Sequence, residues 1–350
     1  MHDTIRTVLV GAAGYTGAEL AGLLAGHPHA ELVGVFGSER RGAEGEPALS
    51  TLFPRLRGQV DLPVRAASVA AILELKPDAV FLCTPHEVSA QMAAPLLAAG
   101  VVVIDLSAAF RLREPGDYPT HYGFEHPNAA LLSQAVYGLP EFNRDEVAQA
   151  DLIACPGCYP TSVALALRPL AKAGLLRTDR PVIVDSASGV SGAGRSPNQK
   201  SLFCEVSFQP YNALKHRHQP EMRQETGCQV LFTPHLLPLD RGILSTIHAE
   251  LADGVTESAV RECLRAAYAN EPFVRLLGKG EWPAISSVER TNFCDIGCAV
   301  DEPTRHLLLV SSIDNLLKGA SGQALQCMNA RFGLPETTGL LAPPSREAVR

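Results

Sequence analysis

The stretch that decides the fold lies close to the start of the chain and reads Val8-Leu9-Val10-Gly11-Ala12-Ala13-Gly14-Tyr15-Thr16-Gly17. A short β-branched run leads directly into three glycines at intervals of three residues, and a helical pattern follows. Glycines at a strand-to-helix turn allow the turn to be tight, let the backbone approach a pyrophosphate, and let the helix pack closely on the strand. The start of the helix then offers free N–H groups to the phosphates. The residues predicted to bind the dinucleotide are Gly11, Gly14, Tyr15, Thr16 and Gly17. The alternative is a glycine-rich turn that only packs a helix.

The residues around this turn indicate a parallel sheet. Short β-branched runs alternate with helical patterns rich in alanine and leucine throughout the first third of the chain. The predicted strands are Thr7–Val10, Glu31–Phe36, Ala79–Cys83 and Val101–Asp105, and the predicted helices are Ala18–Ala25, Ala67–Leu75 and Val88–Ala99. This alternation is typical of βαβ units, so we expect an α/β Rossmann domain built on a parallel sheet.

The pattern changes after Ile153, and the change predicts a second domain. Val182–Ala187 has the composition of a strand, and two further strand-like runs, Asn292–Val300 and Arg305–Ile313, are separated by only four residues. Such a connection indicates an antiparallel hairpin. Thr161–Ala173 and Gly322–Phe332 are predicted helices. We therefore expect an α+β domain with a mixed, largely antiparallel sheet.

Composition limits the classes of protein that the chain can represent. With 350 residues it can form two domains, and its formal net charge of −7 disfavours a nucleic-acid or anionic-membrane partner. No apolar run is long enough to span a bilayer, and the first residues lack the pattern of a signal peptide. The nine cysteines are scattered rather than arranged as a small disulfide framework. These features predict a cytoplasmic protein without a membrane or nucleic-acid partner.

The end of the second predicted strand bears on the choice of cofactor. An enzyme that uses NAD places an acidic residue there for the ribose hydroxyls, whereas this chain has Phe36-Gly37 followed by Ser38-Glu39-Arg40-Arg41. A serine hydroxyl and two arginines suit a 2′-phosphate. We therefore expect NADP(H), bound in part by Ser38, Arg40 and Arg41. Glu39 keeps NAD open as an alternative, and the segment could also be a solvated charged loop.

A cysteine precedes the predicted helix of the second domain, in Ala154-Cys155-Pro156-Gly157-Cys158-Tyr159-Pro160-Thr161. At the start of a helix the dipole and the free N–H groups stabilise a thiolate, and they also stabilise the oxyanion formed when it attacks a carbonyl. Cys158 is thus a candidate nucleophile, with Thr161 expected to cap the helix. Cys155 and Cys158 also match a redox pair or half of a zinc site. Cys294 and Cys298, four apart in a predicted strand, are more consistent with core residues, so no metal site is expected.

A second polar cluster, His216-Arg217-His218, is followed by Gln219-Pro220-Glu221 and preceded by Tyr211. Histidine is the usual proton carrier for a cysteine enzyme near neutral pH, and this cluster is more polar than a core tolerates. Arg111 and Arg241 are candidate ligands for an anion, although each could be an ordinary surface arginine.

Taken in order, these motifs resemble one family, the N-acetyl-γ-glutamyl-phosphate reductases, which are relatives of aspartate-semialdehyde dehydrogenase. The segments that carry the resemblance span nearly the whole chain: residues 11–17, 105–111, 156–161, 188–195, 216–221, 238–242 and 315–323. Each segment is short, but the ordered set is specific. Two positions depart from the family pattern, with Ala109 in place of the usual aspartate and Cys327 in place of the usual asparagine. The first leaves the orientation of Arg111 open.

The resemblance implies a reaction: NADPH-dependent reduction of N-acetyl-L-glutamyl 5-phosphate to the 5-semialdehyde through a thioester on Cys158, with His218 as acid/base. It also implies a Rossmann domain of residues 1–153 and 314–350, a catalytic and oligomerisation domain of residues 154–313, and a homo-oligomer, either a dimer or a tetramer. The substrate would then be held by Arg111, Tyr211, His216, Arg217 and Arg241. The cofactor would be faced by Ser188, Gly189, Asn315 and Lys318.

Three alternatives remain open at this point. The first is an aspartate-semialdehyde dehydrogenase, which carries out the same chemistry on another acyl phosphate. The second is an enzyme that acts on acyl phosphates tethered to a carrier protein. From a different class, a catalytically silent NADP-binding redox sensor would use Cys155 and Cys158 as its switch.

Overall fold

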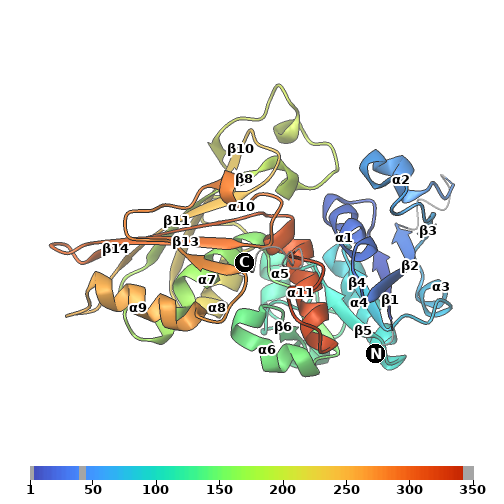
Figure 1. The fold of residues 1–350 in the computed structure, drawn as a ribbon, viewed down its shortest axis with the longest axis horizontal. Helices are drawn as coiled ribbons and strands as arrows, with labels where there is room; N and C mark the ends of the chain where they lie inside the picture. Colours follow the sequence, from blue (N-terminus) through green and yellow to red (C-terminus); the bar gives the residue numbers. More distant parts are fainter. Residues whose placement is uncertain (1–3, 39–44, 342–350) are drawn as a thin grey trace, which may run out of the picture.

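The computed structural model describes residues 4–38 and 45–341, and it contains two seven-stranded sheets (Figure 1). The first sheet has the order β3-β2-β1-β4-β5-β7-β6, and all its strand pairs are parallel. Its strands are Ile5–Val10 (β1), Ala30–Gly37 (β2), Val64–Ala66 (β3), Ala79–Leu82 (β4), Val102–Asp105 (β5), Val136–Tyr137 (β6) and Leu152–Ala154 (β7). The predicted parallel sheet and its four predicted strands are therefore confirmed.

Helices cover both faces of the first sheet, because side chains of a strand alternate between its faces. On β1, Leu9 packs into one core, while Val8 and Val10 pack into the other. The helices of this part are Tyr15–Ala25 (α1), Leu49–Leu52 (α2), Val69–Leu73 (α3), His86–Ala98 (α4), Asp117–Tyr122 (α5) and Pro140–Gln149 (α6).

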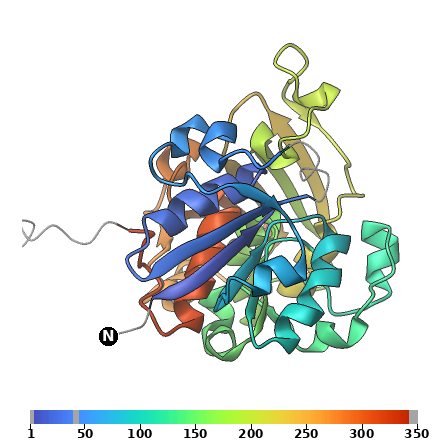
Figure 2. The ribbon, with the colours of Figure 1, turned by 90° about the vertical axis from the view of Figure 1, so that its right-hand side faces the viewer.

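The last helix of the described chain, Gly322–Arg331 (α11), returns to the first sheet. Its Leu325 and Met328 pack in the same core as Leu9. Figure 2 shows this helix, in red, beside the blue strands of the N-terminal region. The first strand and the last helix of the described chain therefore share one core, and the second sheet is formed by the residues between them.

The glycine-rich turn has a geometry that only glycine tolerates. Gly11 has a φ of +87°, and a Cβ at this residue would lie 2.2 Å from the carbonyl oxygen of Cys83, just beyond β4. A Cβ on Gly17 would lie 2.4 Å from the carbonyl oxygen of Gly11, so α1 packs directly against the turn. The ends of β1 and β4 are thereby held together, and a crevice opens beyond them.

The second sheet is mixed, with the order β12-β13-β14-β11-β8-β10-β9. Its strands are Val182–Gly189 (β8), Gln209–Pro210 (β9), Val230–Leu237 (β10), Ile243–Glu250 (β11), Val274–Leu276 (β12), Cys294–Asp301 (β13) and His306–Ile313 (β14). The predicted hairpin is confirmed as β13 and β14, which pair antiparallel. Only the pairs β8–β10 and β12–β13 are parallel.

Three helices, Cys158–Lys172 (α7), Gln219–Thr226 (α8) and Glu257–Tyr268 (α9), lie on one face of the second sheet (Figure 1). Val163 of α7 and Leu264 of α9 pack there against Cys294 and Cys298, so those two cysteines are core residues as predicted. In the described part of the chain, no helix is long and apolar enough to cross a membrane.

Candidate active site

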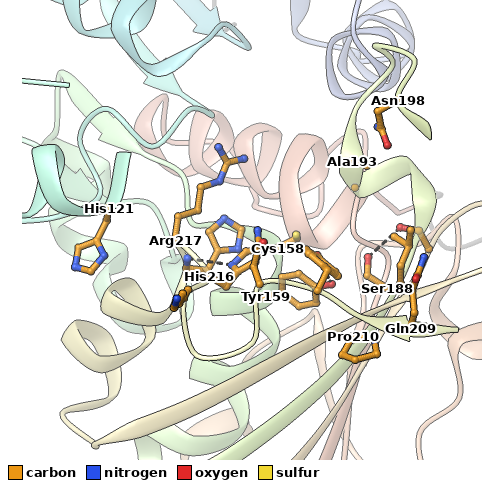
Figure 3. A pocket seen from close by; sticks show the side chains of 17 residues that line it. His121, Cys158, Tyr159, Ser188, Ala193, Asn198, Gln209, Pro210, His216 and Arg217 are labelled. Carbon is orange, nitrogen blue, oxygen red and sulfur yellow. Dashed lines mark hydrogen bonds between the residues drawn. The ribbon is translucent and has the colours of Figure 1, made fainter. Parts of the chain in front are cut away.

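A cavity of about 500 Å³ brings together predicted site residues from three separate segments of the chain (Figure 3). Cys158 and Tyr159 come from the start of α7, and Ser188 and Gly189 come from the end of β8. The segment leading into α8 contributes four more predicted residues, Tyr211, His216, Arg217 and His218. All of these except Tyr159 were predicted as site residues, so seven predicted residues line one cavity.

Cys158 is the first residue of α7, so the helix begins three residues earlier than the sequence predicts. Gly157 is the N-cap residue, and Thr161 does not cap the helix as expected. Instead, the Thr161 hydroxyl donates to the carbonyl oxygen of Gly157 (3.0 Å). The helix starts early because a proline at position 160 is well tolerated in a first turn, where its missing N–H needs no partner.

The loop before Cys158 is held by a fully buried carboxylate, Glu221 of α8. Its Oε1 accepts hydrogen bonds from the Gly157 N–H (2.9 Å) and from the Tyr137 hydroxyl (2.8 Å). Its Oε2 lies 3.7 Å from Nη1 of Arg111. Glu221 was not among the residues predicted for the site. The available signal was its position three residues after His218, which puts both on the first turn of one helix.

The side chains of His218 and Arg111 both pack closely against Gly157. A Cβ at this position would lie 2.7 Å from Nε2 of His218 and 3.0 Å from Nη1 of Arg111. The imidazole, the guanidinium and the backbone just before the thiol are therefore packed together, and only glycine leaves room for them.

Arg111 supports this loop in the structure and does not line the cavity. Its Nε donates to the carbonyl oxygen of Cys155 (2.7 Å), and its Nη2 donates to that of Leu106 (2.8 Å). Ala109, where the family usually has aspartate, is buried. The guanidinium is thus oriented by two backbone carbonyls and Glu221.

Arg241, which was predicted to bind substrate, does not line the cavity in the ligand-free protein. Its Nη2 donates to Glu19 of α1 (2.6 Å), and its Nη1 donates to Asp314 (3.3 Å). Arg241 is buried, and a buried positive charge is stable only when it is paired with carboxylates. Its two ion pairs therefore connect the two domains.

Lys318 and Asn315 are also committed to structural contacts. The ammonium group of Lys318, predicted to face the cofactor, is fully buried and bonds Glu141 (2.5 Å) and Gln326 (2.8 Å). The side chain of Asn315 accepts from the N–H of Gly242 (2.7 Å) and donates to Ser191 (3.0 Å). Both fix the approach to α11.

The two histidines differ in their hydrogen bonds. The backbone N–H of His218 donates to Nδ1 of His216 (3.1 Å), so a neutral His216 carries its hydrogen on Nε2. Nδ1 of His218 is buried and has no hydrogen-bond partner among the described residues. The two rings meet edge to face at 4.8 Å, and both pack against the ring of Tyr159.

Burial keeps the reacting groups neutral in the ligand-free protein. It raises the pKa of the Cys158 thiol to about 11, against the opposing effects of the Tyr159 backbone N–H and Arg111. Burial, His216 and Arg111 hold the pKa of His218 well below its usual range. Burial and Arg217 lower the pKa of His216 to about 4. A neutral thiol therefore faces a cavity with neutral imidazoles.

Cys155 does not share the cavity with Cys158. Its side chain is fully buried in the core of the first domain, where Cys327 is its neighbour and raises its pKa. A redox pair or a zinc half-site needs two accessible sulfurs. Within the described ranges, no group of three or more histidine, cysteine, aspartate or glutamate side chains is arranged to hold a metal ion.

A second and larger depression, of about 1230 Å³, lies beyond the glycine-rich turn. Gly11, Gly14 and Ser38 line it, whereas Tyr15, Thr16 and Gly17 do not. The carbonyl oxygen of Thr16 instead accepts from Ser321, ahead of α11. Arg40 and Arg41 lie outside the described residues.

Arg195 is the one charged side chain among the described residues that line this groove, and it reaches there from the second domain. Its Nη1 donates to the carbonyl oxygen of Ala13 in the glycine-rich turn (3.1 Å), and its guanidinium lies over the ring of Phe53 (4.5 Å). Arg195 lies in one of the segments that carry the family resemblance, but no role was predicted for it.

Comparisons with known proteins agree over almost the whole chain. The family model for the semialdehyde dehydrogenase NAD-binding domain matches residues 6–150, and that for the semialdehyde dehydrogenase dimerisation domain matches residues 158–315. An N-acetyl-γ-glutamyl-phosphate reductase from Aliivibrio fischeri is 49% identical over 96% of this chain and 100% of its own length.

Solved structures share the fold at low sequence identity. Aspartate semialdehyde dehydrogenase II from Vibrio cholerae superposes with a TM-score of 0.69 at 18% identity, covering 94% of this chain and 98% of that one. Aspartate semialdehyde dehydrogenase from Candida albicans, solved with NADP, gives 0.67 at 14% identity over 94% and 98% of the two chains.

The raised pKa of Cys158 predicts how its reactivity depends on pH. Only the thiolate reacts with iodoacetamide, so alkylation of Cys158 in the ligand-free protein should still accelerate about tenfold per pH unit between about pH 8 and 10. Peptide mass spectrometry measures the rate of alkylation at Cys158. The exposed Cys204 in the same digest is the reference thiol for the effect of pH on the reagent. A rate at Cys158 that levels off below about pH 8 would contradict the geometry.

Proposed function

The chain belongs to the semialdehyde dehydrogenase family, among its N-acetyl-γ-glutamyl-phosphate reductases, and we propose that it reduces N-acetyl-L-glutamyl 5-phosphate to N-acetyl-L-glutamate 5-semialdehyde and phosphate. This reaction is a step of arginine biosynthesis. The observation that carries the proposal is the thiol of Cys158 at the start of α7, in one cavity with His218 and Arg217.

We infer that Cys158 is the nucleophile. As its sulfur attacks the acyl carbon, the thiol proton passes to His218, a C–S bond forms, and the bond between the acyl carbon and the phosphate oxygen breaks. The thiol needs this transfer because burial disfavours the free thiolate. The backbone N–H groups at the start of α7 stabilise the oxyanion that forms on the acyl carbonyl. The positive end of the helix dipole lies at the same place and favours this negative charge.

The groove beyond the glycine-rich turn fits a nicotinamide dinucleotide. The backbone of Gly11 and Gly14 lines the groove, and Arg195 supplies a positive charge beside the same turn. When bound, NADPH supplies the hydride that reduces the thioester. We assign Arg195 to the pyrophosphate, because it already bonds the turn whose backbone approaches that group. Ser38, with Arg40 and Arg41, is assigned to the 2′-phosphate.

His218 handles the proton throughout, and its neighbours orient the substrate. The proton that His218 has taken from Cys158 is returned as the C–S bond breaks and the aldehyde is released. His216 and the hydroxyls of Tyr159 and Tyr211, which share a hydrogen bond of 2.9 Å, line the same cavity. We propose that they hold the part of the substrate remote from the phosphate.

We further propose a homo-oligomer formed through the second sheet. Opposite its helices, paired strands carry a row of side chains consisting of Leu231, Ile183, His248 and Leu308. Ile183 in this row is 45% exposed. Three of the four side chains in this row are apolar, as is common at an interface, and the matched model for this part of the chain is that of a dimerisation domain.

The substrate assignment predicts a selective, phosphate-dependent reduction of NADP⁺ in the reverse direction. N-acetylglutamate semialdehyde should be used with a kcat/KM at least about a hundredfold above that of aspartate semialdehyde, because a site that pairs polar substrate groups rejects analogues without them. Steady-state absorbance kinetics measure both. Cys158→Ser should abolish turnover, while Cys155→Ser is the matched control. Preference for aspartate semialdehyde would overturn the assignment, and equal loss in both cysteine variants would favour the redox sensor.

The cofactor assignment predicts two distinct effects on binding. Arg195→Ala should weaken NADPH and NADH alike by about ten- to hundredfold, whereas Arg40→Ala with Arg41→Ala should weaken NADPH only. Fluorescence titration of the ligand-free protein measures each dissociation constant, with Arg195→Lys as the variant that keeps the charge. If the unmodified protein bound NADPH and NADH equally, the 2′-phosphate assignment would be wrong. Unchanged affinities in Arg195→Ala would remove the pyrophosphate contact.

A further inference from the structure

His86 is a residue that neither the sequence analysis nor the mechanism uses. It is the first residue of α4, just after β4, and its Nδ1 accepts a hydrogen bond from the backbone N–H of Ala108 (3.0 Å). A backbone N–H can only donate, so the lone pair of Nδ1 is occupied. In the neutral ring the single hydrogen must therefore be on Nε2.

The other side of the ring faces a second donor. Nη1 of Arg217 lies 3.0 Å from Nε2 of His86, and a guanidinium has no acceptor atom. Two N–H groups thus converge with nothing between them to accept. Protonation of the ring does not resolve this, because imidazolium is also a donor. Burial and Arg217 in any case lower the pKa of His86 to about 4.

The side chain of Arg217 extends from the second domain to His86 in the first. In Figure 3 its guanidinium extends away from His216, and its contact with His86 carries it to the first domain. Its backbone is fixed by the Tyr122 hydroxyl, which donates to the Arg217 carbonyl (3.2 Å). Tyr122 also packs edge to face on the His86 ring, at 5.0 Å. Across the part of the chain that the structure describes, no carboxylate forms an ion pair with Arg217.

We propose that Nε2 of His86 and the guanidinium of Arg217 bind one anionic oxygen of the phosphate, which separates the two donors and satisfies both. A phosphate oxygen accepts several hydrogen bonds at once. This inference rests on the proposed function, in which phosphate is the leaving group of the reduction and the attacking group of the reverse reaction. The site spans both domains, since His86 belongs to the first and Arg217 to the second.

Phosphate is favoured over the carboxylate of the substrate by the local charge. Arg111 and Arg217 both act electrostatically on His86, and the carboxylate that faces Arg111, Glu221, is fully buried on the loop side. A cationic region with one buried counter-ion suits a dianion better than a monoanion. The region also adjoins the cofactor groove, which the neighbouring Pro85 and Val88 line.

Two substitutions of His86 separate anion binding from loop support. In His86→Asn the side-chain oxygen can still accept from Ala108, but the donor at the position of Nε2 is lost. In His86→Gln the amide N–H can replace that donor, but the acceptor for Ala108 is lost. In phosphate-dependent oxidation of the aldehyde, His86→Asn should raise the KM for inorganic phosphate about three- to tenfold, and Arg217→Gln about ten- to hundredfold. His86→Gln should stay within about twofold of the unmodified protein, and the KM for the aldehyde should not move in either His86 variant.

A binding measurement makes the test independent of turnover. Isothermal titration calorimetry with inorganic phosphate on the ligand-free protein should give weaker binding for His86→Asn and Arg217→Gln than for the unmodified protein and His86→Gln. Equal affinity in all four would overturn the site, as would loss in His86→Gln alone. A raised KM for the aldehyde instead of phosphate would assign the donors to the substrate carboxylate and also overturn it. An unmodified protein that binds phosphate at this pair but oxidises no aldehyde would contradict the proposed function and not the site.

Discussion

The rest of the site depends on one buried carboxylate, that of Glu221. Its oxygens accept from the Gly157 N–H and the Tyr137 hydroxyl and face the guanidinium of Arg111, so it connects β6, the loop before α7, and α8. Burial raises the pKa of Glu221 and Arg111 opposes that effect, which makes the carboxylate dependent on these partners. Removing one partner of such a buried pair typically costs about 3–5 kcal/mol. Because His218 stands one turn from Glu221 on the same helix, the contact that fixes the loop also fixes the imidazole relative to Cys158.

The electrostatics of the cavity suit an anionic substrate. The thiol and the imidazoles are neutral without ligand, and the arginines nearby carry the positive charge. The guanidinium of Arg111 is bonded to backbone carbonyls and lies beside Glu221, whereas among the described residues the guanidinium of Arg217 contacts His86, another donor. On the proposed function, an acyl phosphate brings the missing negative charge, and Cys158 then loses its proton only when a carbonyl is present to attack. A thiol that stays protonated in the empty site is also less exposed to oxidation, since the thiolate is the reactive form.

Much of the fold could be predicted from local sequence, whereas several contacts at the site could not. The β-branched runs around Gly11 and the hairpin of β13 and β14 carry patterns that depend on near neighbours, and the structure contains both. The lining of the cavity by Cys158, His216 and His218 also follows from contiguous motifs. The ion pairs of Arg241 and Lys318 could not be predicted, because their partners, Glu19 and Glu141, lie far away in the sequence. The roles of Glu221 and His86 depend likewise on distant backbone N–H groups, those of Gly157 and Ala108, which no local pattern reveals.

The central claim is that Cys158 carries the acyl group, and it can be tested by trapping that group. Without a reduced cofactor the thioester cannot be turned over, so incubation with N-acetylglutamyl phosphate followed by acid quenching and peptide mass spectrometry should reveal a single acyl adduct. The account predicts that this adduct is on Cys158, that phosphate is released in equal amount, and that Cys158→Ser acquires none. An adduct on Cys155, or phosphate release without any adduct on Cys158, would contradict it.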